Sequence, residues 1–235
     1  MKKLTWYHEL GFYSNPFSIK PAAFHNDLFG YDILIDKLNE QVYNSNILFI
    51  HGAYGTGKTT ILKKIINEFR GKRKVIYYNC NKHEGSIDFD GLLIGAGNFF
   101  SRLFKIKKKN MIMLLDEAQD LNKKDMDNVK TYFEQDFFRS VIFVSKKEDI
   151  FLPVGIKKII GKNYYDLNNI SQDEAVTMIR KRIGDLQFLS DEMIIRIFKR
   201  NKNPRAFLKN CEDVCRNTFN DGAEKVTSKD VANFI

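Results

Sequence analysis

The stretch Ile47-Leu-Phe-Ile-His-Gly52-Ala-Tyr-Gly-Thr-Gly-Lys58-Thr-Thr60 indicates the fold of this chain of 235 residues. Its first four residues are apolar and predict a strand, and the spacing of apolar residues after Lys58 predicts a helix over residues 58–69. Between the two, Gly52–Thr59 fits the pattern G-x-x-x-x-G-K-[ST] at every position. The glycines allow several backbone amides to point at one phosphate group, and the positive end of the following helix faces the same oxygens. The sequence therefore predicts a phosphate-binding loop.

The residue types of this loop indicate how a nucleotide and Mg²⁺ are bound. The Lys58 ammonium supplies a point charge between the β- and γ-phosphates, and the Thr59 hydroxyl is a ligand for Mg²⁺. We expect the nucleotide to contact the whole loop, namely Gly52, Ala53, Tyr54, Gly55, Thr56, Gly57, Lys58, Thr59 and Thr60.

A second apolar run, Met111–Leu115, ends in two adjacent carboxylates, Asp116 and Glu117. Neighbouring side chains at a strand end point to opposite sides, so the two can have different roles. Asp116 is expected to hold Mg²⁺, and Glu117 to polarise the water that attacks the γ-phosphate. A predicted strand at residues 74–79 lies between the loop and these carboxylates. This order indicates an ATP-hydrolysing protein with ATP and Mg²⁺ as cofactors.

One short string is typical of guanine nucleotide binding instead. Asn122-Lys-Lys-Asp125 spells N-K-x-D, with which GTPases read guanine. In GTPases the string follows a later strand, whereas here it comes directly after the strand that ends in Asp116-Glu117. The preferred interpretation is a polar turn that leads into the next helix.

Apolar runs alternate with helical patterns up to residue 168, which predicts a parallel sheet with crossover helices. The predicted strands are residues 47–50, 74–79, 111–115, 141–144 and 164–167. The predicted helices are residues 32–43, 58–69, 89–104 and 124–133. The expected fold is a three-layer α/β core of the P-loop NTPase class with a parallel five-stranded sheet.

Only helical patterns follow residue 168. Ser171-Gln-Asp-Glu174 predicts a capping box, and Asn203-Pro204 predicts a helix start with Asn as cap and Pro in the first turn. We expect a core domain at residues 1–168, including an N-terminal segment 1–30, and a helical lid at residues 169–235.

Composition excludes several classes of protein. With 43% hydrophobic and 29% charged residues the chain is neither disordered nor fibrous. Apolar runs end after about five residues, far short of a membrane span of ~18, and no signal peptide is indicated. We expect a cytoplasmic protein.

Three cysteines predict no disulfide framework, and Cys211 and Cys215 are expected on the buried side of a helix.

The motifs together resemble those of AAA+ ATPases, in the group that joins origin-recognition initiators with ATPases of the ExeA and TniB types. Gly11-Phe-Tyr-Ser-Asn-Pro-Phe17 is similar to the "G…NPF" start of ExeA-like proteins. Gly52–Thr59 resembles the Walker A loop, and Asp116-Glu-Ala-Gln119 resembles the "DEAQ" ending of Walker B. Asn203-Pro-Arg205 is similar to the "GNPR" start of the lid helix, although Lys202 replaces the glycine.

The resemblance implies roles for further residues. Ser145 would be the sensor 1 residue that orients the attacking water, unless it is simply a serine that leaves a strand. Arg205 would be the sensor 2 arginine, which reaches the γ-phosphate and couples nucleotide state to the lid. An adenine pocket would use a set of residues that ordinary packing explains equally well: Phe17, Ile19, Phe29 and Tyr31.

Two departures from the family pattern concern partners. Near residues 155–160, relatives have an arginine that reaches the site of a neighbouring subunit. The only basic residues of this chain in that segment are lysines. Because lysine lacks the planar fork of arginine, Lys158 is at most a substitute for it. Since about 65 residues follow the core, we also expect no winged-helix domain like that of initiators.

The charge favours an acidic partner. The formal net charge is +9, and no acidic residue occurs between Gly91 and Leu115. A basic loop beside Phe99 and Phe100 is a candidate for contacts to phosphates and bases, unless these phenylalanines face the core. The candidate contacts are Arg102, Lys105, Lys107, Lys108 and Lys109.

The leading hypothesis is an ATP-hydrolysing AAA+ switch in DNA transactions, which acts on DNA or through a DNA-bound protein. The alternatives are an ATPase that remodels or assembles protein partners, and a slow ATP-binding signalling switch. Either self-association or a protein partner is expected.

Overall fold

The computed structural model describes residues 5–19, 31–71, 74–82 and 85–235. The chain divides into two compact units. Of the described residues, those within 32–54 and 58–168 form the sheet unit, and residues 5–19, 31, 55–57 and 169–235 form the helical unit. Each unit is described by itself.

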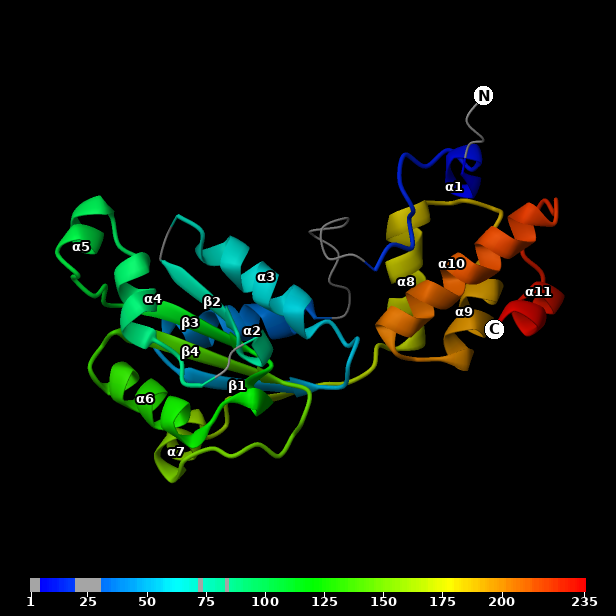
Figure 1. The fold of residues 1–235 in the computed structure, drawn as a ribbon. Coiled ribbons are helices and arrows are strands. Elements are labelled where there is room, and N and C mark those ends of the chain that lie inside the picture. The colour runs from blue at the N-terminus through cyan, green and yellow to red at the C-terminus, as the bar shows by residue number, and fades with distance from the viewer. Residues whose placement is uncertain (1–4, 20–30, 72–73, 83–84) are drawn as a thin grey trace. The chain divides into compact units, whose positions relative to one another are not determined.

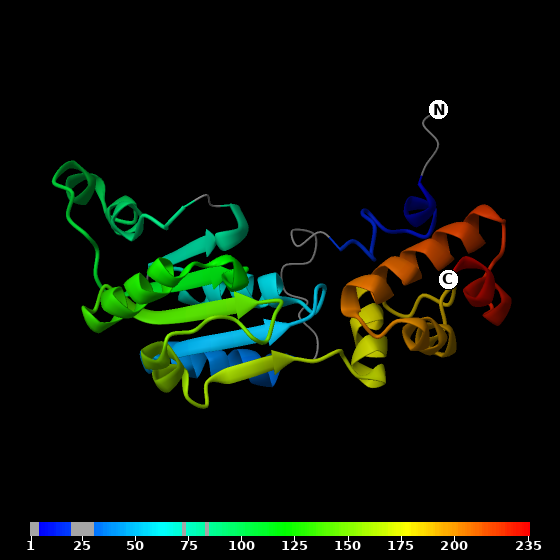
Figure 2. The same ribbon diagram turned by 60° about the horizontal axis from the view of Figure 1, so that its bottom comes forward.

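The sheet unit is built on five parallel strands in the order β2-β3-β4-β1-β5. Their bounds are β1 (Ile47–Gly52), β2 (Val75–Asn79), β3 (Met111–Asp116), β4 (Phe138–Ser145) and β5 (Tyr164–Leu167). Every residue of β3 and all but one of β4 are buried, as expected of central strands covered on both faces. Figures 1 and 2 show the strands side by side, with their carboxyl ends at one edge.

Helices cover both faces of this sheet. They are α2 (Asp32–Tyr43), α3 (Lys58–Phe69), α4 (Phe89–Gly95), α6 (Lys123–Glu134) and α7 (Val154–Ile160). The short helix α5 (Phe99–Leu103) extends beyond the sheet (Figure 1). Helices α4, α6 and α7 bury their apolar side chains in one core with β3 and β4, and α2 and α3 pack together on the other face. The predicted three-layer α/β core is therefore confirmed.

The single helix predicted over residues 89–104 is wrong. The structure has two helices there, because the side-chain Oδ1 of Asn98 accepts a hydrogen bond from the backbone N–H of Ser101 at 2.9 Å and starts a new helix. Helix α4 has already ended at Gly95. The local capping preference of asparagine prevails over the continuous apolar pattern.

The helical unit contains α1 (Trp6–Glu9), α8 (Gln172–Ile183), α9 (Asp191–Arg200), α10 (Pro204–Asn220) and α11 (Ser228–Phe234). The predicted capping box at Ser171 and Glu174 is present. Asn203 caps α10 through its side-chain oxygen, and Pro204 occupies the first helical position. Cys211 and Cys215 are free and buried among the helices, as predicted, and burial raises the pKa of both thiols.

The N-terminal segment packs in the helical unit. The rings of Trp6 and Phe17 stack with centroids 6.1 Å apart, and both belong to the core formed by α8, α9 and α10. The Arg182 guanidinium donates hydrogen bonds to the carbonyl oxygens of Pro16 and Ser18 at 3.0 and 3.2 Å. The sequence predicts residues 1–30 as part of the core domain, whereas the described residues 5–19 pack against helices of the helical unit. Of the described helices, none is long and apolar enough to cross a membrane.

Candidate nucleotide-binding site

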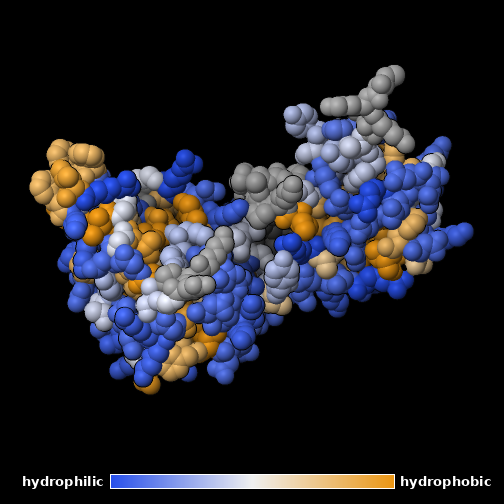
Figure 3. Space-filling view, viewed as in Figure 1, coloured by the Kyte–Doolittle hydropathy of each residue, from blue (hydrophilic) through white to orange (hydrophobic). Residues whose placement is uncertain are grey.

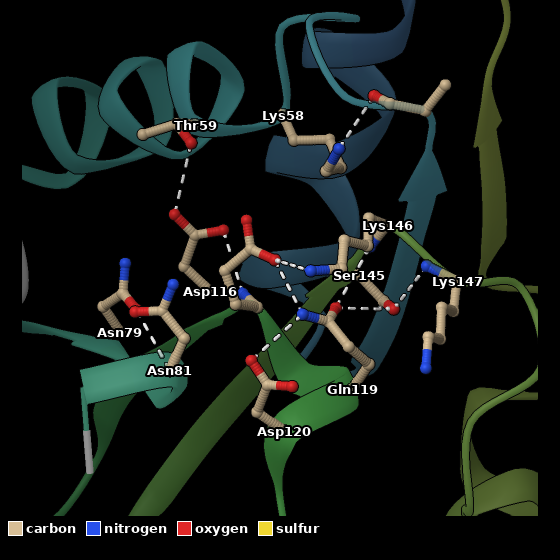
Figure 4. Close-up of polar contacts among 12 residues, drawn as sticks. Lys58, Thr59, Asn79, Asn81, Asp116, Gln119, Asp120, Ser145, Lys146 and Lys147 are labelled. Atoms are coloured by element: carbon tan, nitrogen blue, oxygen red, sulfur yellow. Dashed lines mark hydrogen bonds and ion pairs between the residues drawn. The ribbon is translucent and has the colours of Figure 1, made fainter.

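The carboxyl edge of the sheet brings together residues from three neighbouring strands. Strand β4 lies between β1 and β3, so the loops after β1, β3 and β4 meet at this edge. Figure 4 shows the resulting cluster of polar side chains. This strand order explains why residues from positions 58 to 147 contact one another.

Lys58 begins α3 and is almost completely buried. Its ammonium donates hydrogen bonds to the carbonyl oxygens of Gly52 and Ala53 at 2.7 and 2.9 Å. Burial lowers the pKa of Lys58, and the carboxylates of Glu117 and Asp116 oppose this effect. The cation is therefore fixed against the loop in a site where its charge is poorly screened.

The backbone of the loop has the conformation that its glycines permit. Gly55 and Gly57 have φ angles of +90° and +101°, in the left-handed region that favours glycine. Thr56 between them is buried, whereas Tyr54 is 68% exposed.

Two side-chain donors meet on Asp116. The hydroxyl groups of Thr59 and Tyr77 both donate to its Oδ2, at 3.2 and 2.9 Å. Tyr77 reaches Asp116 because β2 pairs with β3 and places Asn79 opposite Asp116. Burial and the hydrogen bond to Asp116 raise the pKa of Tyr77 to about 12, so this hydroxyl remains a donor at neutral pH.

Thr59 and Asp116 present the oxygen ligands that Mg²⁺ prefers. One carboxylate and one hydroxyl suit an ion that keeps several waters and takes its other ligands from nucleotide phosphates. Together with the loop, these side chains fit Mg²⁺ and a nucleotide.

Glu117 adopts a left-handed backbone conformation, with φ 56° and ψ 43°. A non-glycine residue rarely takes this conformation, which costs about 1 kcal/mol or more. The side-chain amide of Gln119 donates to Glu117 Oε2 at 2.7 Å, and the Lys146 ammonium lies 4.0 Å from the same oxygen. These contacts hold the Glu117 carboxylate at the strand edge.

Gln119 also binds Ser145. Its Oε1 accepts hydrogen bonds from the Ser145 hydroxyl at 3.1 Å and from the Lys146 backbone N–H at 3.2 Å. The Ser145 side chain is buried and in turn accepts from the Lys147 N–H at 2.9 Å. One amide side chain thus links the end of β4 to Glu117. Figure 4 shows Gln119 beside Ser145 and Lys146.

Sequence reasoning missed two residues of this cluster, Gln119 and Tyr77. Gln119 stood in a quoted motif, but nothing in the sequence indicated that its two ends bind Glu117 and Ser145. Tyr77 lies in the middle of an apolar strand, where no local signal separates it from a packing residue.

Other predicted site residues lie outside this cluster. Arg205 is in the first turn of α10, in the helical unit, and Lys158 is exposed on the last turn of α7. Their roles stay predictions. Of the proposed adenine-pocket residues, Phe17 is buried in the core of the helical unit, and Phe29 lies outside the described residues.

The Asn122-Lys-Lys-Asp125 string is part of the fold. The Asn122 side chain caps α6 by accepting from the Asp125 N–H at 2.9 Å. The Asp125 carboxylate is buried and accepts from the Ile87 N–H at 2.7 Å. This geometry agrees with the interpretation as a turn that leads into a helix.

We expect Asp125→Ala to lower the free energy of unfolding by about 1–3 kcal/mol, because the Ile87 amide would lose its buried acceptor. Urea unfolding followed by circular dichroism measures the loss. Asp127→Ala, at an exposed position two residues further along α6, is the matched control. Equal stability of the two variants would show that the Asp125 hydrogen bond contributes nothing.

The basic loop is folded back onto the sheet unit. Arg102 donates to the Gly95 carbonyl oxygen, with Nη2 at 2.7 Å, and the Lys107 ammonium lies 2.7 Å from the Asp90 carboxylate. The Lys109 ammonium lies 5.3 Å from the centre of the Phe137 ring. Contacts of this loop to nucleic acid stay a prediction.

Three solved structures illustrate which proteins share this fold. Cdc6p from Pyrobaculum aerophilum superimposes with a TM-score of 0.69 at 14% identity, over 92% of this chain and 68% of that one. The RuvB Holliday junction branch migration motor of Thermotoga maritima gives 0.67 at 15% identity, over 88% and 68%. The ORC1 protein of Aeropyrum pernix, solved in complex with DNA, gives 0.65 at 14% identity, over 90% and 66%. At such identities these similarities show the fold.

The sequence itself gives the family. No curated protein sequence matches the chain. The family described as the AAA domain matches residues 44–175, which include the loop, both carboxylates and Ser145. Because this match extends over more than half of the 235 residues, the chain belongs to the AAA domain family.

Proposed function

We propose that the chain is a Mg²⁺-dependent ATPase that acts as a nucleotide-driven switch in DNA transactions. The observation that supports hydrolysis best is the hydrogen-bonded link from Glu117 through Gln119 to Ser145, beside Lys58 and Asp116. A site that only bound nucleotide would need no carboxylate held in this way.

Each residue of the cluster has a distinct task in this proposal. The Lys58 ammonium and the loop amides bind the phosphates of ATP, and Thr59 and Asp116 hold Mg²⁺. Bound Mg²⁺ would neutralise charge on the phosphates. Glu117 accepts a proton from the attacking water, and Ser145 orients that water.

Gln119 acts as a positioning residue for Glu117. Without its amide, the Glu117 carboxylate would lose its 2.7 Å hydrogen bond and its fixed orientation. We therefore expect Gln119→Ala to lower kcat by about tenfold or more and to change KM for ATP little, because the phosphate-binding residues are untouched.

Phosphate release at varied ATP concentration separates these two constants. Gln119→Glu keeps the length of the side chain but replaces the donor by a second carboxylate. Its kcat should therefore be at least as low as that of Gln119→Ala. Gln135→Ala, at the exposed end of α6, is the control. An unchanged kcat in Gln119→Ala would contradict the positioning role.

The DNA role is supported by two observations. The formal net charge of +9 favours a polyanionic partner. The fold is shared with ORC1 of Aeropyrum pernix, which was solved in complex with DNA. Arg205, on the first turn of α10, is proposed to couple the bound nucleotide to the helical unit.

The test is steady-state phosphate release from Mg-ATP, with and without duplex DNA, at two salt concentrations. Stimulation by DNA that falls as salt rises would support the DNA role, because contacts to phosphates release counterions. Hydrolysis that does not respond to DNA would favour an ATPase that acts on protein partners. Absence of hydrolysis with ATP still bound would favour a signalling switch.

A further inference from the structure

A cluster of exposed apolar side chains lies on α5 and the residues that follow it. Residues 98–109, here called the tip, contain Phe99, Phe100, Leu103, Phe104 and Ile106, whose exposed fractions are 74%, 67%, 61%, 67% and 56%. Figure 3 shows this region as a hydrophobic patch at the upper left, where Figure 1 places α5. Large apolar side chains gathered in this way mark an interaction surface.

The tip is amphipathic. At 100° per residue, the first four apolar residues of the tip lie within an arc of about 140° on one side of α5. Ser101 lies outside this arc and is buried, with its hydroxyl donating to Asn98 Oδ1 at 2.7 Å. The helix therefore turns its polar contact inward and its apolar face outward.

The apolar face is held in place and is not a fraying segment. The Ile106 N–H donates to the Ser101 carbonyl oxygen at 2.7 Å, and Arg102 is bound to Gly95. Lys107 is anchored between the Asp90 carboxylate and the rings of Tyr132 and Phe137. An apolar surface that is ordered before binding loses little conformational entropy on association.

The charge of the tip is entirely positive. Residues 91–115 include five cations and no acidic residue. Lys105 and Lys109 are exposed, and Lys108 is half-buried. Arg102 lies between apolar residues in the sequence but outside the apolar arc of α5, and Lys107, Lys108 and Lys109 follow the last apolar residue of the tip. The cations therefore flank the apolar face of the helix.

We propose that the tip docks on an anionic lipid surface, with its apolar side chains inserted among the acyl chains and its lysines at the phosphate headgroups. Phenylalanine, leucine and isoleucine beside lysines are the composition of interfacial helices. Leu103 and Ile106 offer no ring for stacking on bases, and a protruding face offers no groove for a partner helix. Nucleic acid and protein partners fit the tip less well for these reasons.

The position of the tip is compatible with nucleotide binding. The tip leads into Met111 at the amino end of β3, whereas the nucleotide-site residues lie at the carboxyl edge. Docking would leave that edge accessible. The inference therefore goes beyond the proposed ATPase and does not depend on it.

The test is flotation of the full chain with vesicles of phosphatidylcholine, with or without phosphatidylglycerol. We expect binding to the anionic vesicles only. Phe100→Ser/Phe104→Ser should weaken it at least about tenfold through lost apolar burial. Lys105→Glu/Lys108→Glu should weaken it by about 25-fold or more, at about fivefold per lysine near an anionic surface.

Matched controls separate the tip from general effects. Phe151→Ser/Val154→Ser removes two exposed apolar side chains elsewhere in the sheet unit, and Lys199→Glu/Lys229→Glu makes the same charge change in the helical unit. Circular dichroism and thermal unfolding show whether each variant is folded. Folded tip variants that lose binding while both controls keep it would support the proposal.

Three results would overturn the proposal. The first is no binding to anionic vesicles, and the second is equal binding by the tip variants and their controls. The third is that the protein does not bind vesicles while a tip variant loses duplex DNA binding or self-association. This result would assign the tip to nucleic acid or to a second copy of the chain.

Discussion

Glu117→Gln is expected to lower kcat for ATP hydrolysis by about 10²–10⁴-fold, the usual contribution of a general base, while ATP remains bound. The substituted amide still offers a carbonyl oxygen to the Gln119 donor, which lies 2.7 Å from Glu117 Oε2. It is also compatible with the left-handed backbone at this position, since the two residues differ only at the end of the side chain. The variant therefore removes the proton acceptor and leaves the geometry intact.

Two measurements decide the outcome. Phosphate release gives kcat, and calorimetric titration with Mg-ATP gives the affinity, which should change by less than about threefold. Glu134→Gln makes the same chemical change at an exposed position at the end of α6 and should leave both values unchanged. Turnover near the wild-type rate in Glu117→Gln would mean that another group accepts the proton.

Lys58→Ala is expected to weaken Mg-ATP binding by about 10- to 150-fold. This change in affinity corresponds to the free energy that a hydrogen bond to a charged group usually contributes. The effect is large because Lys58 is buried against the loop carbonyls, where water screens its charge poorly. Hydrolysis should fall further, since negative charge develops on the transferred phosphoryl oxygens.

Lys58→Ala also leaves the carbonyl oxygens of Gly52 and Ala53 without their donor, so the fold of the variant has to be checked by thermal unfolding. Lys58→Arg keeps the charge but not the compact ammonium, and it should recover little affinity. Lys63→Ala, on the same helix, is the control. Full ATP affinity in a folded Lys58→Ala protein would contradict the assignment of the phosphate site.

The strands and most helices of the sheet unit could be predicted because their signals are local. The helix at residues 58–69 and the strand at residues 164–167 have the predicted bounds. The capping residues Ser171 and Asn203 bind backbone amides within three positions along the chain, so their sequence context suffices. The failure at residues 89–104 has a local cause too, because the Asn98 cap could have been recognised from its residue type.

Contacts across the sheet could not be predicted in this way. Gln119 reaches Ser145 only because β4 lies between β1 and β3, and Tyr77 reaches Asp116 only because β2 pairs with β3 in one register. Apolar periodicity marks a strand but does not determine which strand becomes its neighbour. The exposure of Phe99 and Phe100 could not be predicted either. A phenylalanine next to a helix start can lie in a core or on a surface.

The amino-acid sequence by itself determined the phosphate-binding loop, the paired carboxylates, the helix caps and the class of fold, because each depends on residues close together along the chain. The tertiary structure alone decided the hydrogen-bonded link between Glu117 and Ser145, the hydroxyl pair on Asp116 and the outward apolar face of the tip. These features depend on strand order and on the burial of one helix side, which arise from packing between segments distant in sequence.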